Sequence, residues 1–302
     1  MNFPDRLNNL IQQKQTPLIV GIDPRAERLP NGFTKTGNLQ SLANSYEQFS
    51  CAIIDVVADL VPGIKPQAAF FELLGPPGMA ALFNVVKYAR SKGLLVIMDA
   101  KRGDIGSTAA AYASAFLGDE NNSAWGCDCL TVNPYLGDDS LTPFVERCTT
   151  TNAGIFVLVR TSNPGGKMLQ ELTANEEKIY SIVGKHVQEL AIQTIGKSNY
   201  GAVGAVIGAT NPSQLAELRC KMPNTIFLVP GIGAQGATPA DIGGAFDSSG
   251  LGAVINSSRA IIFAYENERY SAMTDWQHAV EAATKDTIQA IAAETSAGKL
   301  VR

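Results

Sequence analysis

Eight short apolar runs, each followed by a longer amphipathic segment, alternate along the chain of 302 residues. Apolar runs without polar alternation are typical of strands buried on both faces of a parallel sheet. The segments between them repeat apolar residues at spacings of three and four, which predicts helices packed against that sheet. The runs, with the loops into which they lead, occupy residues 18–23, 63–70, 94–108, 129–135, 154–166, 201–210, 225–238 and 252–261.

The order of these elements predicts the fold class. Eight strand-then-helix units, with no break in composition between them, predict an α/β fold that is a single (β/α)8 TIM barrel over residues 1–302. An open doubly wound sheet is the alternative, but no G-x-G-x-x-G motif follows the first run, which disfavours its dinucleotide-binding form. The longest helix is expected over residues 170–195, and the sequence suggests no function for residues 171–199.

Composition narrows the classes of partner. Hydrophobic residues make up 45% of the chain and charged residues 17%, which supports a large core and argues against disorder. The net charge of −4, without a block of basic residues, argues against a nucleic-acid partner. No apolar run approaches the ~18–20 residues of a membrane span, and the N-terminus lacks a signal-peptide pattern, so no membrane partner is expected.

The cysteines indicate the compartment. There are five, an odd number, and in a chain of this size we expect reduced, mostly buried thiols of a cytoplasmic protein. Cys127 and Cys129 flank Asp128, but without a second pair of ligands this spacing does not predict a metal site. The two histidines, His186 and His278, fall in helical segments, so histidine-based acid–base catalysis is not expected.

The third run ends in a cluster of charges. Asp99, Lys101, Arg102 and Asp104 follow the apolar residues 94–98 directly. Asp99 and Lys101 are two positions apart, so in a strand they point to the same side. Burying such a pair is costly, and the carboxyl end of a barrel strand is where active sites lie, which favours a functional interpretation. The alternatives are an ion pair that closes the strand, a solvated loop charge at Arg102, and Asp104 as a helix N-cap.

Polar residues end other runs as well. Lys65 lies inside a run whose other residues are predicted to be buried. A buried lysine requires a carboxylate partner, and Asp99 and Asp104 are the candidates. The alternative is a surface lysine whose aliphatic stem covers apolar groups. Pro66 follows Lys65, and its effect on the direction of the lysine is left open. The other strand-end residues with functional side chains are Asp23, Asn133, Ser162, Gln235 and Arg259.

The last two loops predict a phosphate site. PGIGAQGAT offers flexible glycines with free N–H groups, and INSSRAI places Ser258 and Arg259 at an expected helix start. Helix N-termini and the arginine side chain both favour phosphate, and these loops hold it in many barrels of this class. The alternative is that the glycines only form turns and Arg259 is a surface charge.

A resemblance to a known family rests on these residues. The segment DAKRGDI, from Asp99 to Ile105, with Lys65 on the preceding run, resembles the D-x-K-x-x-D-I signature of orotidine 5′-phosphate decarboxylases. The longer form DAKRGDIGSTA resembles the second, bacterial-type subfamily. Further matching segments are distributed along the chain: GIDP, KPQAAFFE, TSNPGG, PGIGAQG and SSRAI.

The resemblance implies a small-molecule substrate and a reaction. The substrate would be orotidine 5′-monophosphate, decarboxylated to uridine 5′-monophosphate in the last step of de novo pyrimidine nucleotide biosynthesis, with no metal or organic cofactor. Loss of CO₂ leaves a vinyl carbanion, which a fixed ammonium stabilises and then protonates, and the resemblance assigns this role to Lys101. The implied catalytic array consists of Lys65, Asp99, Lys101 and Asp104.

The resemblance also implies a homodimer with shared active sites. Asp104 would reach the active site of the partner subunit, and Ile105 and Thr108 would approach the partner's ligand. The remaining implied substrate contacts are Asp23, with Lys65, to the ribose hydroxyls, Ser162 to the pyrimidine, and Gln235 and Arg259 to the phosphate, with Ser258 beside them.

Two other functions compete with this one. Related barrels that use Mg²⁺ to process sugar phosphates share the D-x-K-x-x-D pattern but carry a metal-binding carboxylate on the second strand, where this chain has Lys65. A non-catalytic nucleotide-binding barrel would keep the phosphate loops and lose the charged array. The array is complete in this sequence, which favours the enzyme.

Overall fold

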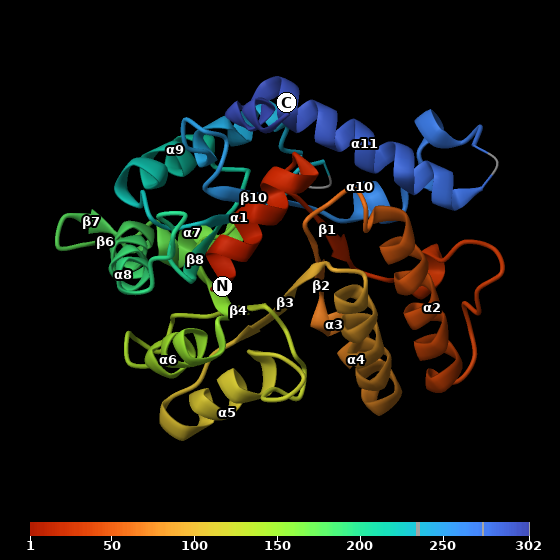
Figure 1. Cartoon of the computed structure of the whole chain (residues 1–302), viewed down its shortest axis with the longest axis horizontal. Helices are drawn as coiled ribbons and strands as arrows, with labels where there is room; N and C mark the ends of the chain where they lie inside the picture. The colour runs from red at the N-terminus through yellow and green to blue at the C-terminus, as the bar shows by residue number, and fades with distance from the viewer. Residues whose placement is uncertain (234–235, 274, 302) are drawn as a thin grey trace.

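The computed structural model describes residues 1–233, 236–273 and 275–301. Its centre is a closed barrel of eight parallel strands in the order β1-β10-β9-β8-β5-β4-β3-β2 (Figure 1). This confirms the predicted TIM barrel, and each predicted run contains one barrel strand. The strands are β1 (Leu18–Ile22), β2 (Gly63–Pro66), β3 (Leu95–Arg102), β4 (Cys129–Val132), β5 (Gly154–Arg160), β8 (Val203–Ile207), β9 (Phe227–Pro230) and β10 (Ala253–Ser257).

Helices surround the barrel and follow its strands. They are α1 (Phe3–Lys14), α2 (Leu39–Val57), α3 (Ala68–Glu72), α4 (Gly75–Ser91), α5 (Gly106–Phe116), α6 (Thr142–Thr151), α7 (Lys167–Gln170), α8 (Ile179–Gln193), α9 (Pro212–Lys221), α10 (Arg259–Ile262) and α11 (Trp276–Glu294). Short 3-10 turns, such as η2 (Pro164–Gly166) and η3 (Pro239–Ala245), join some of them. The strand residues are almost all buried, because the barrel core lies on one face and the helices on the other. Among the described helices, none has both the length and the apolar character needed to cross a bilayer.

The first helix closes the amino end of the barrel. α1 crosses the end that faces the viewer in Figure 1, and its Phe3 packs edge-to-face on Phe156 and lies against Gly154 at the start of β5. Arg6 of the same helix forms an ion pair with Asp128, just before β4. The cavity of the barrel therefore opens at the opposite end, where the carboxyl ends of the strands lie.

Two predicted elements differ from the structure. The second run does not stay extended to residue 70, because β2 ends at Pro66 and α3 begins at Ala68. The expected helix over residues 170–195 is wrong in its first part. There the chain forms a hairpin of β6 (Thr173–Ala174) and β7 (Glu177–Lys178), and α8 begins only at Ile179.

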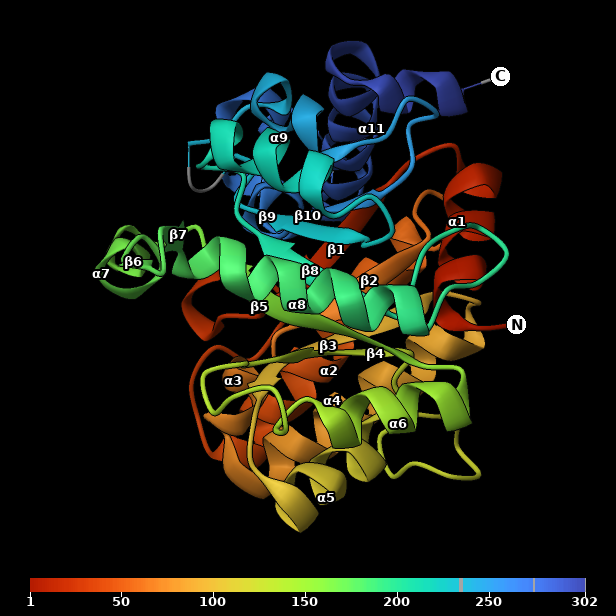
Figure 2. The ribbon, with the colours of Figure 1, turned by 90° about the vertical axis from the view of Figure 1, so that its left-hand side faces the viewer.

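The hairpin forms because its two central residues adopt left-handed backbone angles. Asn175 and Glu176 have φ angles of 48° and 67°, the combination that closes a two-residue hairpin turn. With η2 and α7 the hairpin makes up residues 164–178, which we call the arm. Figure 2 shows the arm standing out to the left beyond the helices that surround the barrel. The cysteines are all free, and Cys127, Cys129 and Cys148 are buried.

Candidate active site

A cavity of about 430 Å³ lies at the carboxyl ends of the barrel strands. Every barrel strand, or the loop that follows it, contributes residues to its lining. Its size falls within the range of small-molecule sites, which bury most of a ligand in a few hundred Å³. The predicted residues that line it are Asp23, Lys65, Asp99, Lys101, Ser162, Ser258 and Arg259.

Asp99 is the centre of the polar lining. Its carboxylate is buried, and each of its two oxygens accepts two hydrogen bonds. Oδ2 lies 2.7 Å from Lys65 Nζ and 3.1 Å from Gln67 Nε2. Oδ1 lies 2.6 Å from Lys101 Nζ and 3.0 Å from Thr131 Oγ1. The carboxylate is thus held between two ammonium groups, one on each oxygen, with its orientation set by two neutral donors.

The two ammonium groups keep this array charged. Burial by itself lowers the pKa of the Lys65 ammonium, but attraction to Asp99, and then to Asp23, outweighs burial and places that pKa above its ordinary value. Burial likewise opposes ionisation of Asp99, yet the charges of Lys65 and then Lys101 hold the pKa of its carboxyl well below the usual range. Around neutral pH Lys65 and Asp99 are therefore both ionised.

Lys101 owes its position to an irregularity in β3. Its φ angle of 47° lies in the left-handed region, and the pairing of β3 with β4 shifts register between Met98 and Arg102. The freed N–H groups of Ala100 and Lys101 donate to Thr131 Oγ1, at 3.1 and 2.9 Å. The spacing argument was right that Lys101 and Asp99 meet, but the strand between them is not regular.

Two buried acceptors in the cavity have no partner among the described residues. These are Oδ1 of Asp23, at the end of β1, and Oδ1 of Asn256, on β10. A buried acceptor without a partner costs free energy unless a ligand or water donates to it. Neighbouring acceptors of this kind suit a ligand with hydroxyl groups.

Pro66 does not turn Lys65 away from the site. It is the last residue of β2, and the chain continues along β1, where the N–H of Gln67 donates to Ile22 at 3.1 Å. Lys65 is buried and directed at Asp99, so it is not a surface lysine. Arg102 is not a solvated loop charge either: it ends β3, is half-buried, pairs with Glu72 and lies over Phe116.

Four predicted residues whose positions the structure describes lie outside the cavity lining, and one of them is Asn133, which is exposed after β4. Ile105 and Thr108 are exposed at the start of α5, and Asp104 is half-buried before it. Asp104 does not cap α5, because the N-cap is Ile105 and, within the described part of the chain, the Asp104 carboxylate accepts one hydrogen bond, from the N–H of Ile105 at 2.8 Å. Gln235 lies outside the described residues.

Sequence reasoning missed Gln67, Thr131 and Asn256, which all line the cavity. A signal for each was present. Gln67 is two positions after Lys65, Thr131 interrupts the apolar run CLTV, and Asn256 interrupts AVINS. A polar residue that shares the inward face of a barrel strand with apolar neighbours is a reason to expect a site contact.

The chain is similar in sequence and in structure to known proteins of one family. Residues 16–273 match the family described as orotidine 5′-phosphate decarboxylase / HUMPS. The chain belongs to this family. The resemblance noted in the sequence is confirmed by this match, which covers all eight barrel strands completely.

Proteins named orotidine 5′-phosphate decarboxylase or OMP decarboxylase align with this chain over nearly their full lengths. The orotidine 5′-phosphate decarboxylase of Rhodopirellula baltica is 52% identical over 292 residues, which is 94% of this chain and 97% of that protein. That of Caldicellulosiruptor bescii is 39% identical, covering 98% of this chain and 100% of the relative. The solved structure of Leishmania donovani OMP decarboxylase superposes with a TM-score of 0.76 at 32% identity, covering 97% of this chain and 98% of that one.

Proposed function

We propose that this protein decarboxylates orotidine 5′-monophosphate to uridine 5′-monophosphate, in the last step of de novo pyrimidine nucleotide biosynthesis. The observation that carries the proposal is the Lys65–Asp99–Lys101 array, with both ammonium groups in contact with one buried carboxylate at the mouth of the barrel. Membership of the family and the names of the relatives support the same reaction.

Lys101 is the proton donor in this proposal. Loss of CO₂ leaves a carbanion on the pyrimidine ring, and an ammonium held beside that carbon stabilises the developing charge before it transfers a proton. The Lys101 side chain is half-exposed to the cavity and anchored to Asp99, so its ammonium is available to a ligand yet fixed in place. Asp99, held ionised, repels the substrate carboxylate and disfavours the ground state.

The donor set favours a reaction without a metal. All four hydrogen bonds to Asp99 come from protein donors, so its oxygens have no lone pair free for a cation. The place on β2 where the Mg²⁺-dependent relatives carry a carboxylate is occupied by the positive charge of Lys65. No cofactor is therefore part of the proposed mechanism.

The rest of the cavity matches the parts of the nucleotide. Arg259 and Ser258, after β10, and Gln235 would hold the phosphate. Asp23, whose free oxygen faces the cavity, would accept the ribose hydroxyls together with Lys65. Ser162, after β5, would contact the pyrimidine.

We further propose a homodimer with Asp104 contributed across the interface. Asp104, Ile105 and Thr108 follow the array in sequence but do not line the cavity of their own subunit, which leaves them available to a partner's site.

The proposed enzyme is a single domain over residues 1–302. We place it in the cytoplasm, because its cysteines are free thiols.

Absorbance tests the proposal directly. Purified protein is added to orotidine 5′-monophosphate in EDTA, and loss of substrate absorbance is followed for the wild type, Lys101→Ala and the control Lys285→Ala. Lys285 is an exposed lysine paired with Glu281 on α11. Turnover by the wild type and the control, but not by Lys101→Ala, is expected. No turnover by any of them, with turnover of sugar phosphates when Mg²⁺ is added, would overturn the proposal.

A further inference from the structure

Among the residues that the structure describes, Arg160 has the largest fully buried side chain, with 1% of its surface exposed. It is the last residue of β5 and directly precedes Thr161, Ser162 and Asn163, which line the cavity. A fully buried guanidinium costs several kcal/mol of desolvation, and apolar residues of similar volume are often at least as stabilising. Such a residue calls for a role other than filling the core.

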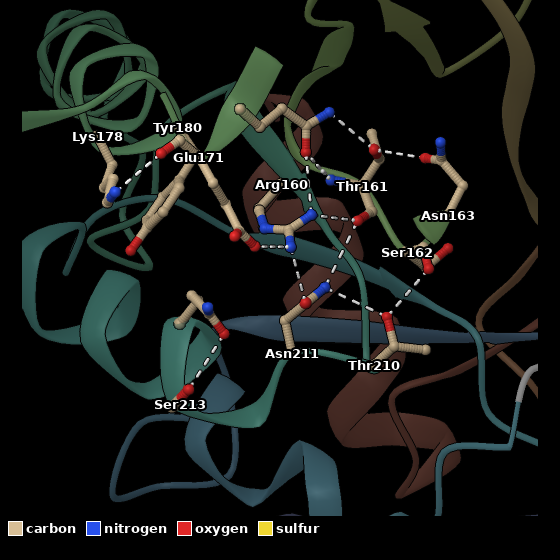
Figure 3. A network of polar contacts seen from close by, with 12 residues as sticks. Arg160, Thr161, Ser162, Asn163, Glu171, Lys178, Tyr180, Thr210, Asn211 and Ser213 are labelled. Carbon is tan, nitrogen blue, oxygen red and sulfur yellow. Dashed lines mark hydrogen bonds and ion pairs between the residues drawn. The ribbon is translucent and has the colours of Figure 1, made fainter. Parts of the chain in front are cut away.

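The guanidinium of Arg160 joins the backbone of the next residue to the arm and to the loop before α9 (Figure 3). Nη1 donates to Thr161 O at 2.9 Å and to Gln170 Oε1 at 3.2 Å, and Nη2 donates to Glu171 Oε1 at 2.6 Å and to Asn211 Oδ1 at 2.9 Å. Gln170 and Glu171 belong to the arm, and Asn211 precedes α9. Glu171 is its ion-pair partner among the described residues.

The arm also holds the cavity segment directly. Gln170 Oε1 accepts the N–H of Thr161 at 3.0 Å, and Gln170 Nε2 donates to Thr161 Oγ1 at 2.8 Å. The Thr161 hydroxyl in turn donates to Asn163 Oδ1 at 2.7 Å. Both neighbours of Ser162 are thus tied to a network that ends in the arm.

The opposite side of Ser162 is fixed by the loop after β8. Thr210 Oγ1 donates to Ser162 O at 3.1 Å, and Gly208 packs so closely that an added Cβ would lie 2.6 Å from Ser162 Cα. Ser162 is therefore held between the loop after β8 and the network of Arg160. A shift of Ser162 therefore requires that the contacts of the loop after β8 or the hydrogen bonds of the Arg160 network break.

We propose that Arg160, Gln170 and Glu171 are positioning residues that set the place of Ser162, so that the arm is part of the machinery that recognises the base of the nucleotide. The inference rests on the proposed function, in which Ser162 contacts the pyrimidine. Arg160 does not touch the ligand and acts through the backbone of residues 161–163. The phosphate subsite at Arg259 lies on a different strand end, so the network governs the base and not the phosphate.

Two ligands separate this role from general damage to the fold. Uridine 5′-monophosphate presents a base to Ser162, whereas ribose 5-phosphate carries only the sugar and the phosphate. Binding of both is measured by calorimetry to the wild type, Glu171→Gln, Gln170→Ala and Glu281→Gln. Glu281→Gln is the matched control, because it removes a carboxylate from an ion pair on α11.

We expect Glu171→Gln and Gln170→Ala each to weaken uridine 5′-monophosphate binding about tenfold, the size of one misplaced hydrogen bond. Ribose 5-phosphate binding should stay within about twofold of the wild type, because its contacts lie elsewhere. Adding Ser162→Ala to Gln170→Ala should weaken nucleotide binding little further, since both changes remove the same contact. Gln170→Ala also covers the case in which Glu171→Gln, with its unpaired buried guanidinium, fails to fold.

Several results would overturn the inference. One is that the arm variants bind uridine 5′-monophosphate and ribose 5-phosphate more weakly by the same factor. Another is that both arm variants bind the nucleotide as the wild type does. The third is that the effects of Gln170→Ala and Ser162→Ala on nucleotide binding are additive. A wild type that neither binds uridine 5′-monophosphate nor consumes orotidine 5′-monophosphate would instead refute the proposed function, and this inference with it. The wild-type measurement therefore distinguishes the two failures.

Discussion

The Thr131 hydroxyl lies 3.0 Å from Oδ1 of Asp99 and donates to it, while its two lone pairs accept the N–H groups of Ala100 and Lys101. A single oxygen on β4 thus fixes both the carboxylate at the centre of the array and the backbone that carries Lys101. This uses the full hydrogen-bonding capacity of a threonine hydroxyl. Thr131 is a positioning residue of the proposed reaction.

Thr131→Val should reduce turnover more than it reduces binding. Valine keeps the shape of the side chain but leaves two buried N–H groups without an acceptor, so the backbone at Lys101 shifts. We expect kcat to fall about 10- to 100-fold, the typical cost of displacing a catalytic group by about 1 Å. Steady-state kinetics with orotidine 5′-monophosphate, and calorimetric binding of uridine 5′-monophosphate, measure the two effects.

Thr284→Val is the matched control for this substitution. Thr284 is also fully buried, but its hydroxyl bonds Val280 O at 2.7 Å within α11, away from the cavity. Its kcat should equal that of the wild type. Equal losses of kcat in the two variants would show that the effect of Thr131→Val is one of stability.

Neutralising Asp99 should give the stability a dependence on pH near neutrality that Asp99 and Lys65 do not give in the wild type. In the wild type the pKa of Asp99 is lowered, so its stabilising contribution is present above the unfolded pKa of about 3.9 and is lost as pH falls through the folded pKa. The pKa of Lys65 is raised, so its contribution is present below the unfolded pKa of about 10.4 and is lost as pH rises through the folded pKa. Between about pH 5 and 9 neither group gives a slope.

In Asp99→Asn, the attraction of Asp23 is left to oppose burial, which is the largest influence on the pKa of Lys65, so this pKa is expected to fall below the unfolded value. The unfolded state then binds more protons, so the free energy of unfolding should rise with pH from neutral to about pH 10. At pH 7 the variant should be about 3 kcal/mol less stable, because a buried charge has lost its partner. Urea unfolding at several pH values measures both. A flat profile for the variant between pH 7 and 10 would contradict the assignment.

Gly208→Ala should displace Ser162. A Cβ at this position would lie 2.6 Å from both Cα and Cβ of Ser162, closer than such atoms approach in real structures. Because Ser162 is held on its other side by the network of Arg160, we expect about tenfold weaker uridine 5′-monophosphate binding, measured by calorimetry. Gly243→Ala is the control, since its Cβ would meet only Glu294 O at 3.9 Å. Unchanged binding in Gly208→Ala would mean that Ser162 does not contact the ligand.

Subunit sharing can be tested by complementation. In a dimer of one Lys101→Ala subunit and one Asp104→Asn subunit, one site combines the intact Lys101 of one chain with the intact Asp104 of the other. Co-expression of the two inactive variants should restore about one quarter of wild-type activity, because half of randomly paired dimers are mixed and each has one complete site.

Co-expression of Lys101→Ala with Asp99→Asn is the control for complementation. Lys101 and Asp99 pair within one subunit, so every site in such a mixture lacks one of them. No activity should return. If the mixture with Asp104→Asn is equally inactive while mixed dimers are present, Asp104 does not act across the interface.

Much of the barrel and part of the site follow from local patterns. Continuous apolar runs predict the eight strands because a strand that is buried on both faces has no solvent-exposed face for polar side chains. A carboxylate partner for Lys65 follows from the cost of a buried ammonium. The spacing of Asp99 and Lys101 indicates their contact, but the backbone that makes it is irregular at Lys101 and is not encoded in that spacing. The part of the predicted helix over residues 171–178 was wrong, because Asn175 and Glu176 adopt left-handed angles that apolar periodicity does not reveal.

The sequence by itself determined the fold class, the family and the residues that end the strands, because burial and strand periodicity act between neighbours in the chain. Only the tertiary structure decided which of those residues meet. Thr131 and Gln67 reach Asp99 across 32 residues each, and Arg160 reaches Asn211 across 51. Each of these contacts joins two neighbouring strands of the barrel, or the loops that follow them: β3 with β4, β2 with β3, and β5 with β8. No local periodicity encodes which strands become neighbours, and hydrogen bonds between distant residues are fixed by the pairing and register of the strands that carry them.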